Sequence, residues 1–435
     1  MSNGQLSLNL FGEHPEETQN FFTKKRSWSA SKHRIILKYI QSQCYSLGGK
    51  KSFQSQHINY IDGFAGEGKY DEGFGIEDFI EQSKFWKRYE IELLNTDGSP
   101  LIALKCAKIF NLEGRVNLRC FFAEADKSRH QKLMQNCRAV GERLEYKIYT
   151  CQKFENVLPE IMNDLQGYPS LFFVDTFGVK GLRFEQICLI SDYLSQYKGE
   201  LFLLFHNIQV ARHAGQDTAK SEAARMNKAS QTYSQNLTEL LGVNSDKDWK
   251  PKWLELKNKP QQFERWALKY FKQRIIRDSK FNGVASFEIK EKYNDTRPRY
   301  SIVACSNHPN KAFGEFLNEF FAEENRLLFY EEDKTGMFRN FLDQEWQRQN
   351  KQRKAEIKPR IIELIKKVNW RWMTLKDTIT LVILQLDEIG FGLGYLKRSD
   401  YRGIIVELFE EGIIETQVKD IKKGLTLKSL IRFVQ

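Results

Sequence analysis

The chain lacks the cysteine patterns of disulfide-rich and zinc-binding proteins. It has 7 cysteines in 435 residues, with no Cys-x-x-Cys pair and no Cys/His zinc spacing. They are Cys44, Cys106, Cys120, Cys137, Cys151, Cys188 and Cys305. We therefore expect reduced thiols, most of them small core residues, in a cytoplasmic protein without a metal site.

Long apolar runs are lacking as well. No stretch approaches the roughly 20 apolar residues of a membrane span, and the polar start of the chain does not have the pattern of a signal peptide. These features predict a soluble, cytoplasmic protein that does not act at a membrane.

Acidic residues are outnumbered by basic ones. The formal net charge is +11, with 41% hydrophobic residues available for cores. The length predicts two or three structural units, and the positive charge favours an acidic partner, of which nucleic acid is the commonest.

The most informative stretch is 57–69, HINYIDGFAGEGK. Apolar and aromatic residues run into Asp62 and then into a glycine loop, which predicts a buried strand followed by a loop that binds a nucleotide-type ligand. The order is G-x-x-G-x-G rather than the dinucleotide G-x-G-x-x-G. It is similar to the loop of class I methyltransferases that use S-adenosylmethionine (SAM), where the acidic residue lies near the methionine amine. The candidate cofactor residues are Asp62, Gly63, Phe64, Ala65, Gly66 and Gly68. The alternative is a glycine-rich turn without a ligand.

The next elements supply further cofactor candidates. Residues 70–97 read as an insertion, followed by a helix from Ser99 as N-cap to Gly114. A strand over 117–123 ends at Glu124, which is placed to accept hydrogen bonds from ribose hydroxyls. A third strand over 146–150 would bring Cys151 and Gln152 near an adenine edge.

Two later strands supply the catalytic and substrate candidates. The strand over 170–174 ends in Asp175-Thr176-Phe177-Gly178, and the strand over 200–205 leads to His206, Asn207 and Arg212. Because ligands gather at the carboxyl ends of parallel strands, we expect Asp62, Glu124 and Asp175 to share one crevice. Asp175 and Phe177 are the catalytic candidates. His206, Asn207 and Arg212 are expected to face substrate, with a place on the surface as the equal alternative for Arg212.

Residues 212–277 predict a helical insertion with Trp249, Trp253 and Trp266. The tryptophans either stack on nucleic acid or pack inward. Two antiparallel strands, 283–291 and 300–306, then close the sheet as in a methyltransferase, and a helix over 311–323 completes the domain.

The predicted domains are a tail (1–20), a Rossmann-like domain (21–340), a charged linker or solvated helix (341–360) and a winged-helix-like module (361–435). The module is expected to contain helices over 361–368, 375–386 and 402–411 and strands over 414–418 and 424–426. Its candidate phosphate ligands are Lys397, Arg398, Lys422 and Lys423. Such modules also dock proteins.

Taken together, the motifs resemble the three-Cys-motif partner family (TcmP). The matching pieces are Trp28 with Lys32-His33, the loop at 61–68, Gly98-Ser99-Pro100, Phe122-Ala123-Glu124 and Phe173-Val174-Asp175 with Phe177-Gly178. The resemblance implies a class I SAM-dependent methyltransferase fold and an iron–sulfur partner protein with a three-cysteine cluster. Asp-Thr-Phe-Gly at 175–178 departs from the family's Asp-Pro-Phe-Gly.

These observations predict an α/β protein with a Rossmann-like methyltransferase sheet, a helical insertion and a C-terminal winged-helix-like module. The expected function is SAM-dependent methylation of nucleic acid. One alternative is a non-catalytic nucleic-acid-binding partner of the three-cysteine protein, and another is a nuclease built on the acidic strand ends.

Overall fold

The computed structural model describes residues 22–48, 57–73, 95–114, 116–217, 228–331, 333, 337–368, 372–418 and 420–434. The predicted tail at 1–20 and most of the predicted insertion at 70–97 lie outside these ranges. In the described part of the chain, none of the helices has both the length and the apolar character needed to cross a membrane.

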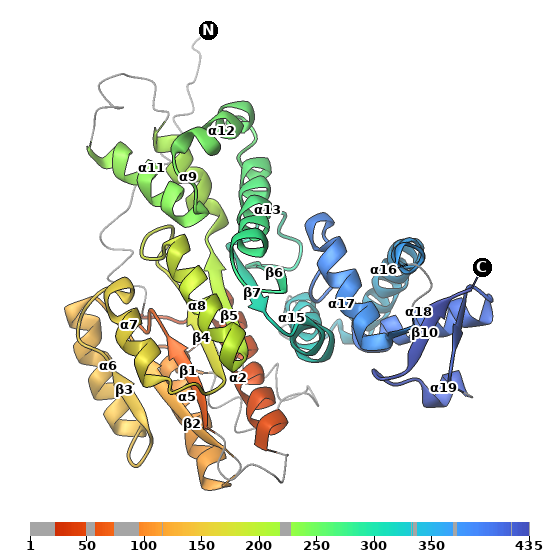
Figure 1. Cartoon of the computed structure of the whole chain (residues 1–435), viewed down its shortest axis with the longest axis horizontal. Coiled ribbons are helices and arrows are strands. Elements are labelled where there is room, and N and C mark those ends of the chain that lie inside the picture. The colour runs from red at the N-terminus through yellow and green to blue at the C-terminus, as the bar shows by residue number, and fades with distance from the viewer. Residues whose placement is uncertain are drawn as a thin grey trace.

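A seven-stranded sheet forms the centre of the molecule, in the order β3-β2-β1-β4-β5-β7-β6 (Figure 1). Its strands are β1 (His57–Asp62), β2 (Asn117–Phe122), β3 (Tyr146–Ile148), β4 (Ser170–Val174), β5 (Gly199–Phe205), β6 (Gly283–Ile289) and β7 (Tyr300–Ser306). β7 is antiparallel to both of its neighbours, and the other pairs are parallel. The predicted α/β fold with a Rossmann-like methyltransferase sheet is therefore confirmed.

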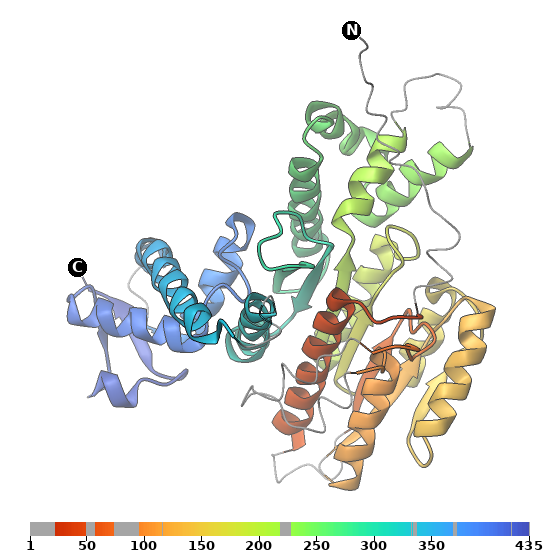
Figure 2. The same cartoon turned by 180° about the vertical axis from the view of Figure 1, so that it is seen from behind.

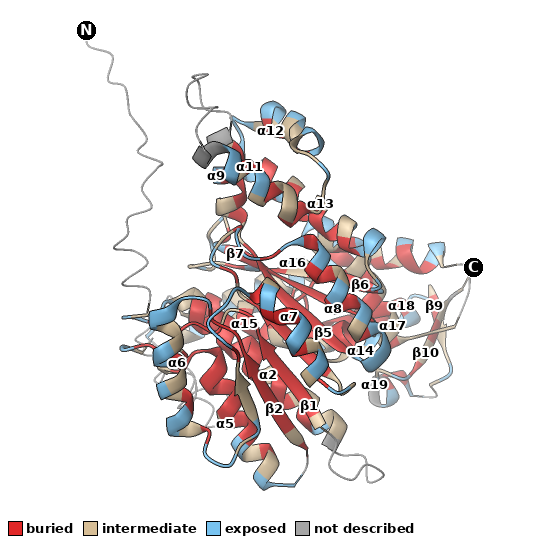
Figure 3. Cartoon of the chain, turned by 60° about the vertical axis from the view of Figure 1, so that its left-hand side comes forward, coloured by how far each residue is buried: buried red, intermediate tan, exposed pale blue. Residues whose placement is uncertain are grey.

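The apolar strands are buried because helices cover both faces of the sheet. Every residue of β4 and β5 is buried, as continuous apolar runs in a parallel sheet require (Figure 3). One face carries α2 (Ser27–Gly48), α5 (Ser99–Leu112), α6 (Lys127–Val140) and α15 (Asn318–Tyr330); α2 (red) and α5 (orange) are in front in Figure 2. The other carries α7 (Phe154–Asp164), α8 (Phe184–Tyr197) and α13 (Pro260–Asp278).

The predicted insertion at 212–277 is helical. It contains most of α9 (Asn207–Asp217), and then α11 (Lys228–Leu241), α12 (Lys250–Leu256) and α13. Trp249 and Trp253 are buried, and the Trp249 Nε1–H donates to Thr238 Oγ1 at 3.0 Å. These two tryptophans pack inward and present no ring for stacking on a base.

The predicted charged linker at 341–360 is wrong. Those residues belong to α16 (Arg339–Lys367), a helix of 29 residues. Glu, Gln, Lys and Arg are good helix formers, and the helix buries Ile357, Ile361, Leu364 and Ile365. The solvated-helix alternative describes this stretch better, and the helix predicted over 361–368 is its last part.

The C-terminal unit follows as β8 (Met373–Thr374), α17 (Leu375–Leu386), α18 (Arg398–Glu410), β9 (Ile414–Thr416), α19 (Ile421–Gly424) and β10 (Leu430–Phe433). The strands form an antiparallel sheet in the order β8-β10-β9. The strand predicted over 424–426 is wrong, because 421–424 is helical and the strand comes later. Segments this short contain too few residues for apolar periodicity to distinguish helix from strand.

The C-terminal unit is not separated from the sheet domain. Its apolar residues belong to the same core as α2 and α15. Between β7 and β8, the described chain forms α14 (Pro309–Lys311), a π-helical turn over Ala312–Leu317, α15 and α16. A buried ion pair between Lys272 of α13 and Asp387 after α17 also joins the two parts.

Candidate active site

The sheet brings the three acidic candidates together at the C-terminal ends of its parallel strands. Asp62 is in register with Phe122 of β2 and Phe173 of β4, so Glu124 and Asp175 follow the strands on either side of β1. All three carboxylates therefore lie at the carboxyl ends of adjacent parallel strands, where open α/β sheets bind ligands.

The glycine loop is held in place by Glu124. The Gly66 N–H donates to Glu124 Oε2 at 2.9 Å, and the Asp126 N–H donates to Oε1 at 2.8 Å. Gly66 and Gly68 have φ of +62° and +77°, and a Cβ on Gly66 would lie 2.5 Å from the ring of Phe22. Glycine is needed here because the backbone is left-handed and closely packed.

The loop's amides are less available than the sequence suggested. Gly63 N–H donates to the Phe173 carbonyl, Ala65 N–H to the Ala123 carbonyl, and Gly66 N–H to Glu124. With Phe64 N–H donating to Asp62, four consecutive amides are already bonded. The loop thus offers a ligand close approach to its backbone rather than a row of open donors.

Asp62 lies beneath the loop and is fully buried. Its Oδ1 accepts from Phe64 N–H at 3.2 Å, and the Ser99 hydroxyl also bonds its carboxylate. Burial raises the pKa of Asp62 to about 7, although these hydrogen bonds act in the opposite direction. Asp62 is not among the residues that line the adjacent cavity, so it shapes the loop rather than facing a ligand.

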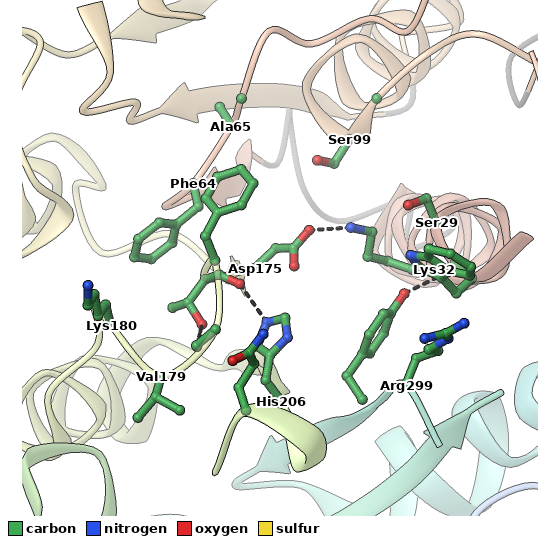
Figure 4. A pocket seen from close by; sticks show the side chains of 18 of the residues that line it. Ser29, Lys32, Phe64, Ala65, Ser99, Asp175, Val179, Lys180, His206 and Arg299 are labelled. Atoms are coloured by element: carbon green, nitrogen blue, oxygen red, sulfur yellow. Dashed lines mark hydrogen bonds and ion pairs between the residues drawn. The ribbon is translucent and has the colours of Figure 1, made fainter. Parts of the chain in front are cut away.

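A cavity of about 620 Å³ opens above these strand ends (Figure 4). Aromatic rings and cations dominate its lining. The rings are Phe22, Trp28, Phe64, Tyr70, Phe177 and Tyr300, and the cations are Lys32, Lys180, Arg212 and Arg299. Gly66, Gly68, Ser99, Asp175, His33, His206 and His213 also line it.

A second cavity of about 610 Å³ adjoins the first. Glu124, Asp126, Arg129 and Phe154 are among its lining residues. Phe64, Phe177, Val179 and Lys180 line both cavities. The Arg129 guanidinium lies 4.6 Å from the centre of the Phe177 ring. The glycine loop and Glu124 thus belong to one continuous region with Phe177 at its middle.

Asp175 forms an ion pair with Lys32 of α2. The Lys32 side chain is 5% exposed and that of Asp175 is 21% exposed. Burial lowers the pKa of Lys32, but Asp175, Tyr70 and Asp62 together outweigh burial and raise the pKa. Sequence reasoning gave Lys32 no role, and its only signal was its place in the Trp28, Lys32-His33 motif.

Two histidines also line the first cavity, and sequence reasoning assigned neither a specific role, although His206 was among the polar groups that could face substrate. His206 follows β5, and its Nε2 lies 2.5 Å from the Thr176 carbonyl oxygen. His33 is buried with no hydrogen-bond partner at Nδ1. Burial, together with the cations Lys25, Lys32 and Arg34, holds the pKa of His33 well below its usual value, so the ring is neutral.

Some predicted site residues lie elsewhere. Asn207 is buried and accepts from the Ser301 hydroxyl at 3.0 Å, so its predicted substrate contact is wrong, whereas Arg212 lines the cavity. Cys151 and Gln152 are exposed and line neither cavity. The Cys151 thiol instead donates to the Ala125 carbonyl at 3.1 Å.

The cations predicted to bind phosphates are also placed differently. Lys397 donates to Glu323 at 2.7 Å, so its charge is compensated within the protein. Arg398 begins α18, and its backbone N–H bonds Glu319. The side chains of Lys422 and Lys423 are outside the described part of the structure.

Five of the seven cysteines are buried, which agrees with their predicted role as core residues. Among the described residues, no group of three His, Cys, Asp or Glu side chains could hold a metal ion.

The fold defines the class of this protein as a Rossmann-like α/β protein with a mostly parallel central sheet. No protein-family model matches the chain, and no curated protein matches it.

Among solved structures, the chain is similar to the plantazolicin methyltransferase BamL in complex with a triazolic desmethylPZN analog and SAH. The TM-score is 0.30 at 9% identity, covering 68% of this chain and 92% of that one. A putative rRNA methylase from Clostridium thermocellum gives 0.25 at 8% identity, covering 61% and 96%. YjhP from E. coli gives 0.21 at 11% identity, covering 66% and 98%.

Proposed function

We propose that the protein is a SAM-dependent methyltransferase. The observation that carries this proposal is the hydrogen bond between the glycine loop after β1 and the Glu124 carboxylate after β2. Gly66 and Gly68 of this loop are left-handed, and the loop lies at the C-terminal ends of the parallel strands. Nucleotide-type ligands bind at these strand ends in open α/β sheets.

The side chains around the loop fit this cofactor. Glu124 lines the second cavity and would accept from ribose hydroxyls, while Gly66 and Gly68 line the first cavity. The neutral His33 has a bare Nδ1 and would accept from the ammonium group, a role first expected for Asp62. When bound, SAM supplies an electrophilic methyl group on a sulfonium. The protein's part is to position the reacting atoms and to exclude water.

We further propose nucleic acid as the acceptor. The net charge is +11, and Lys180, Arg212 and Arg299 line the cavity together with aromatic rings. The Arg299 guanidinium lies 4.9 Å from the centre of the Trp28 ring, and Phe177 is 44% exposed. Cations beside exposed rings suit phosphates and unstacked bases.

The C-terminal unit supports a docking role. The order of its elements, α16, β8, α17, α18, β9, α19 and β10, and its one antiparallel sheet support our proposal of a winged-helix-like unit in which α18 would take the place of the recognition helix. Glu407 and Glu411, on α18 and at its C-cap, bind Lys358 of α16. Because Lys397, a predicted phosphate ligand of this unit, is paired with Glu323, we propose that the unit docks a protein, such as the three-cysteine partner that the TcmP resemblance implies.

A non-catalytic role is the second candidate. It is favoured by the ion pair of Asp175 with Lys32, since a paired carboxylate is a poor base. In that case the chain would bind SAM or nothing and would present nucleic acid to its partner.

Calorimetry with SAM tests the cofactor site. We expect binding by the wild type, loss of binding in Gly66→Ala, and unchanged binding in Gly114→Ala. Gly114 is the matched control because its φ is +63° and no atom lies within 4 Å of its added Cβ. Absence of heat and of a thermal shift with the wild type would remove the enzyme proposal.

A filter assay with tritiated SAM then tests the acceptor. DNA, RNA and protein are offered separately, and we expect label in a nucleic acid only. Label in protein alone would overturn the proposed acceptor class, and SAM binding without label in any substrate would favour the non-catalytic role.

A further inference from the structure

His206 is held in one tautomer by the backbone of the neighbouring strand end. Its Nε2 lies 2.5 Å from the Thr176 carbonyl oxygen, which can only accept a hydrogen bond (Figure 4). Nε2 therefore carries the proton, and in the neutral ring Nδ1 has a free lone pair. Among the described residues, none bonds this Nδ1.

The surroundings of His206 keep the ring neutral. Burial lowers the pKa of His206, and Lys32 acts in the same direction, while Asp175 and the hydrogen bond to Thr176 oppose them. The Tyr300 ring lies 5.8 Å away between centres, and Arg299 lines the same cavity. A neutral imidazole with an open nitrogen in a cavity is suited to remove a proton.

The neighbouring carboxylate is less suited to that task. Asp175 is paired with a lysine that is almost completely buried, so protonating Asp175 would leave Lys32 as an unpaired buried charge. The predicted role of Asp175 as the group that deprotonates the acceptor therefore passes to His206, and Asp175 with Lys32 becomes a fixed part of the cavity wall.

We propose that His206 is the catalytic base of this site and that the acceptor is a hydroxyl group, which within a nucleic acid strand is the ribose 2′-hydroxyl of RNA. This inference rests on the proposed function. The hydroxyl oxygen forms a bond to the methyl carbon as the carbon–sulfur bond breaks. The electron pair of that bond goes to sulfur and neutralises the sulfonium. The hydroxyl proton moves to Nδ1 of His206 and from there to water. A neutral hydroxyl is a weak nucleophile, so it needs such a base more than an amine does.

The first test does not depend on activity. Nitrogen NMR of the histidine-labelled protein without ligand should show a protonated Nε2 and an unprotonated Nδ1 for His206 at neutral pH, assigned by loss of the signals in His206→Gln. A protonated Nδ1 would overturn the proposal.

The second test measures single-turnover methyl transfer to RNA and to DNA of the same sequence. His206→Gln keeps an amide N–H that can bond Thr176 but has no basic nitrogen. We expect it to bind SAM as the wild type does and to lose at least on the order of 10²-fold in rate. The wild-type rate should fall on the acid side, where the ring takes up a proton, and the variant should lack that dependence.

His308→Gln is the matched control, because His308 lines a separate cavity at the N-terminal ends of β4 and β5. It should transfer methyl groups at the wild-type rate. Equal rates for His206→Gln and the wild type, or equal methylation of DNA and RNA, would overturn the inference. Failure of the wild type to bind SAM would instead overturn the proposed function, while the NMR result would still report the tautomer.

Discussion

Two buried lysine–aspartate pairs in this molecule differ in what surrounds them. At the junction with the C-terminal unit, Asp387 accepts from Lys272 and from both the backbone and the hydroxyl of Ser286. At the cavity, Asp175 is paired through Oδ2 with Lys32, and among the described residues no hydrogen bond to its other oxygen is found. The junction aspartate is bonded at both oxygens, and the cavity aspartate keeps one for a ligand.

The difference shows how the same two residue types serve structure or function. A pair whose polar atoms are all bonded inside the protein stabilises one arrangement and offers nothing to a ligand. A pair with an unused acceptor beside a cavity keeps binding capacity at the expense of stability.

The largest expected effect comes from breaking the junction pair. Asp387→Ala leaves Lys272 buried without its counter-charge and should lower the free energy of unfolding by about 3–5 kcal/mol. Asp175→Ala should cost less, because Asp62 also interacts favourably with Lys32. Urea unfolding of both variants measures this order. A larger loss for Asp175→Ala would contradict it.

The next effect sharpens the contrast through pH. The folded-state pKa of Asp62 is about 7, above its ordinary value of 3.8, so the folded state holds this proton more tightly than the unfolded state. Wild-type stability should therefore fall as pH rises between about 4 and about 7. Asp62→Asn should remove the part of this pH dependence that comes from Asp62. The Tm of the variant minus that of the wild type should therefore increase between about pH 4 and about pH 7 and stay constant above that range.

Glu200→Gln is the control for this pH experiment. Burial also raises the pKa of Glu200 to about 7, but Glu200 lies near the N-terminal end of β5, away from the C-terminal ends of the strands where Asp62 lies. Both variants should flatten the pH dependence of Tm, and only Asp62→Asn should alter SAM affinity. Parallel Tm curves for Asp62→Asn and the wild type would show that this carboxyl is not the titrating group.

A smaller effect is expected at the ring between the two cavities. Phe177→Ala should weaken nucleic-acid binding by about 1–3 kcal/mol through lost stacking, with little change in stability because the ring is half-exposed. Phe409→Ala removes a similarly exposed ring from α18 and should leave binding unchanged. Fluorescence titrations with labelled oligonucleotides compare the two, and equal losses would place the binding surface elsewhere.

The smallest effect is expected at Lys397, which lies outside the cavity. Lys397→Ala removes its bond to Glu323, but Glu323 keeps Arg326 as a partner, so the stability loss should be about 1 kcal/mol or less. Nucleic-acid affinity should not change, because this charge is already compensated. A clear loss of affinity, together with a weaker salt dependence, would restore the phosphate contact predicted from the sequence.

The strands could be predicted because their signal is local. Each core strand is a short apolar run, and β4 and β7 begin and end where the sequence indicates. The placement of acidic residues at three strand ends, and hence their meeting at one end of the sheet, follows from the parallel arrangement.

The partners of those residues could not be predicted in the same way. Lys32 and Asp175 are 143 positions apart, and Asn207 is fixed by Ser301, 94 positions away. Nothing local distinguishes Asn207, which is used in the core, from Arg212, which lines the cavity five residues later in the same helix. For the same reason, the sequence could not decide whether the tryptophans of the insertion stack on nucleic acid or pack inward, because both roles use the same residue type.

By itself, the sequence determined the α/β alternation, the glycine loop after β1 and the acidic strand ends, because apolar runs and backbone-permissive residues act over a few positions. Only the tertiary structure decided which polar groups are bonded internally and which remain open to a ligand. That choice depends on which segments, distant in the sequence, bring a donor, an acceptor or a counter-charge to each buried atom.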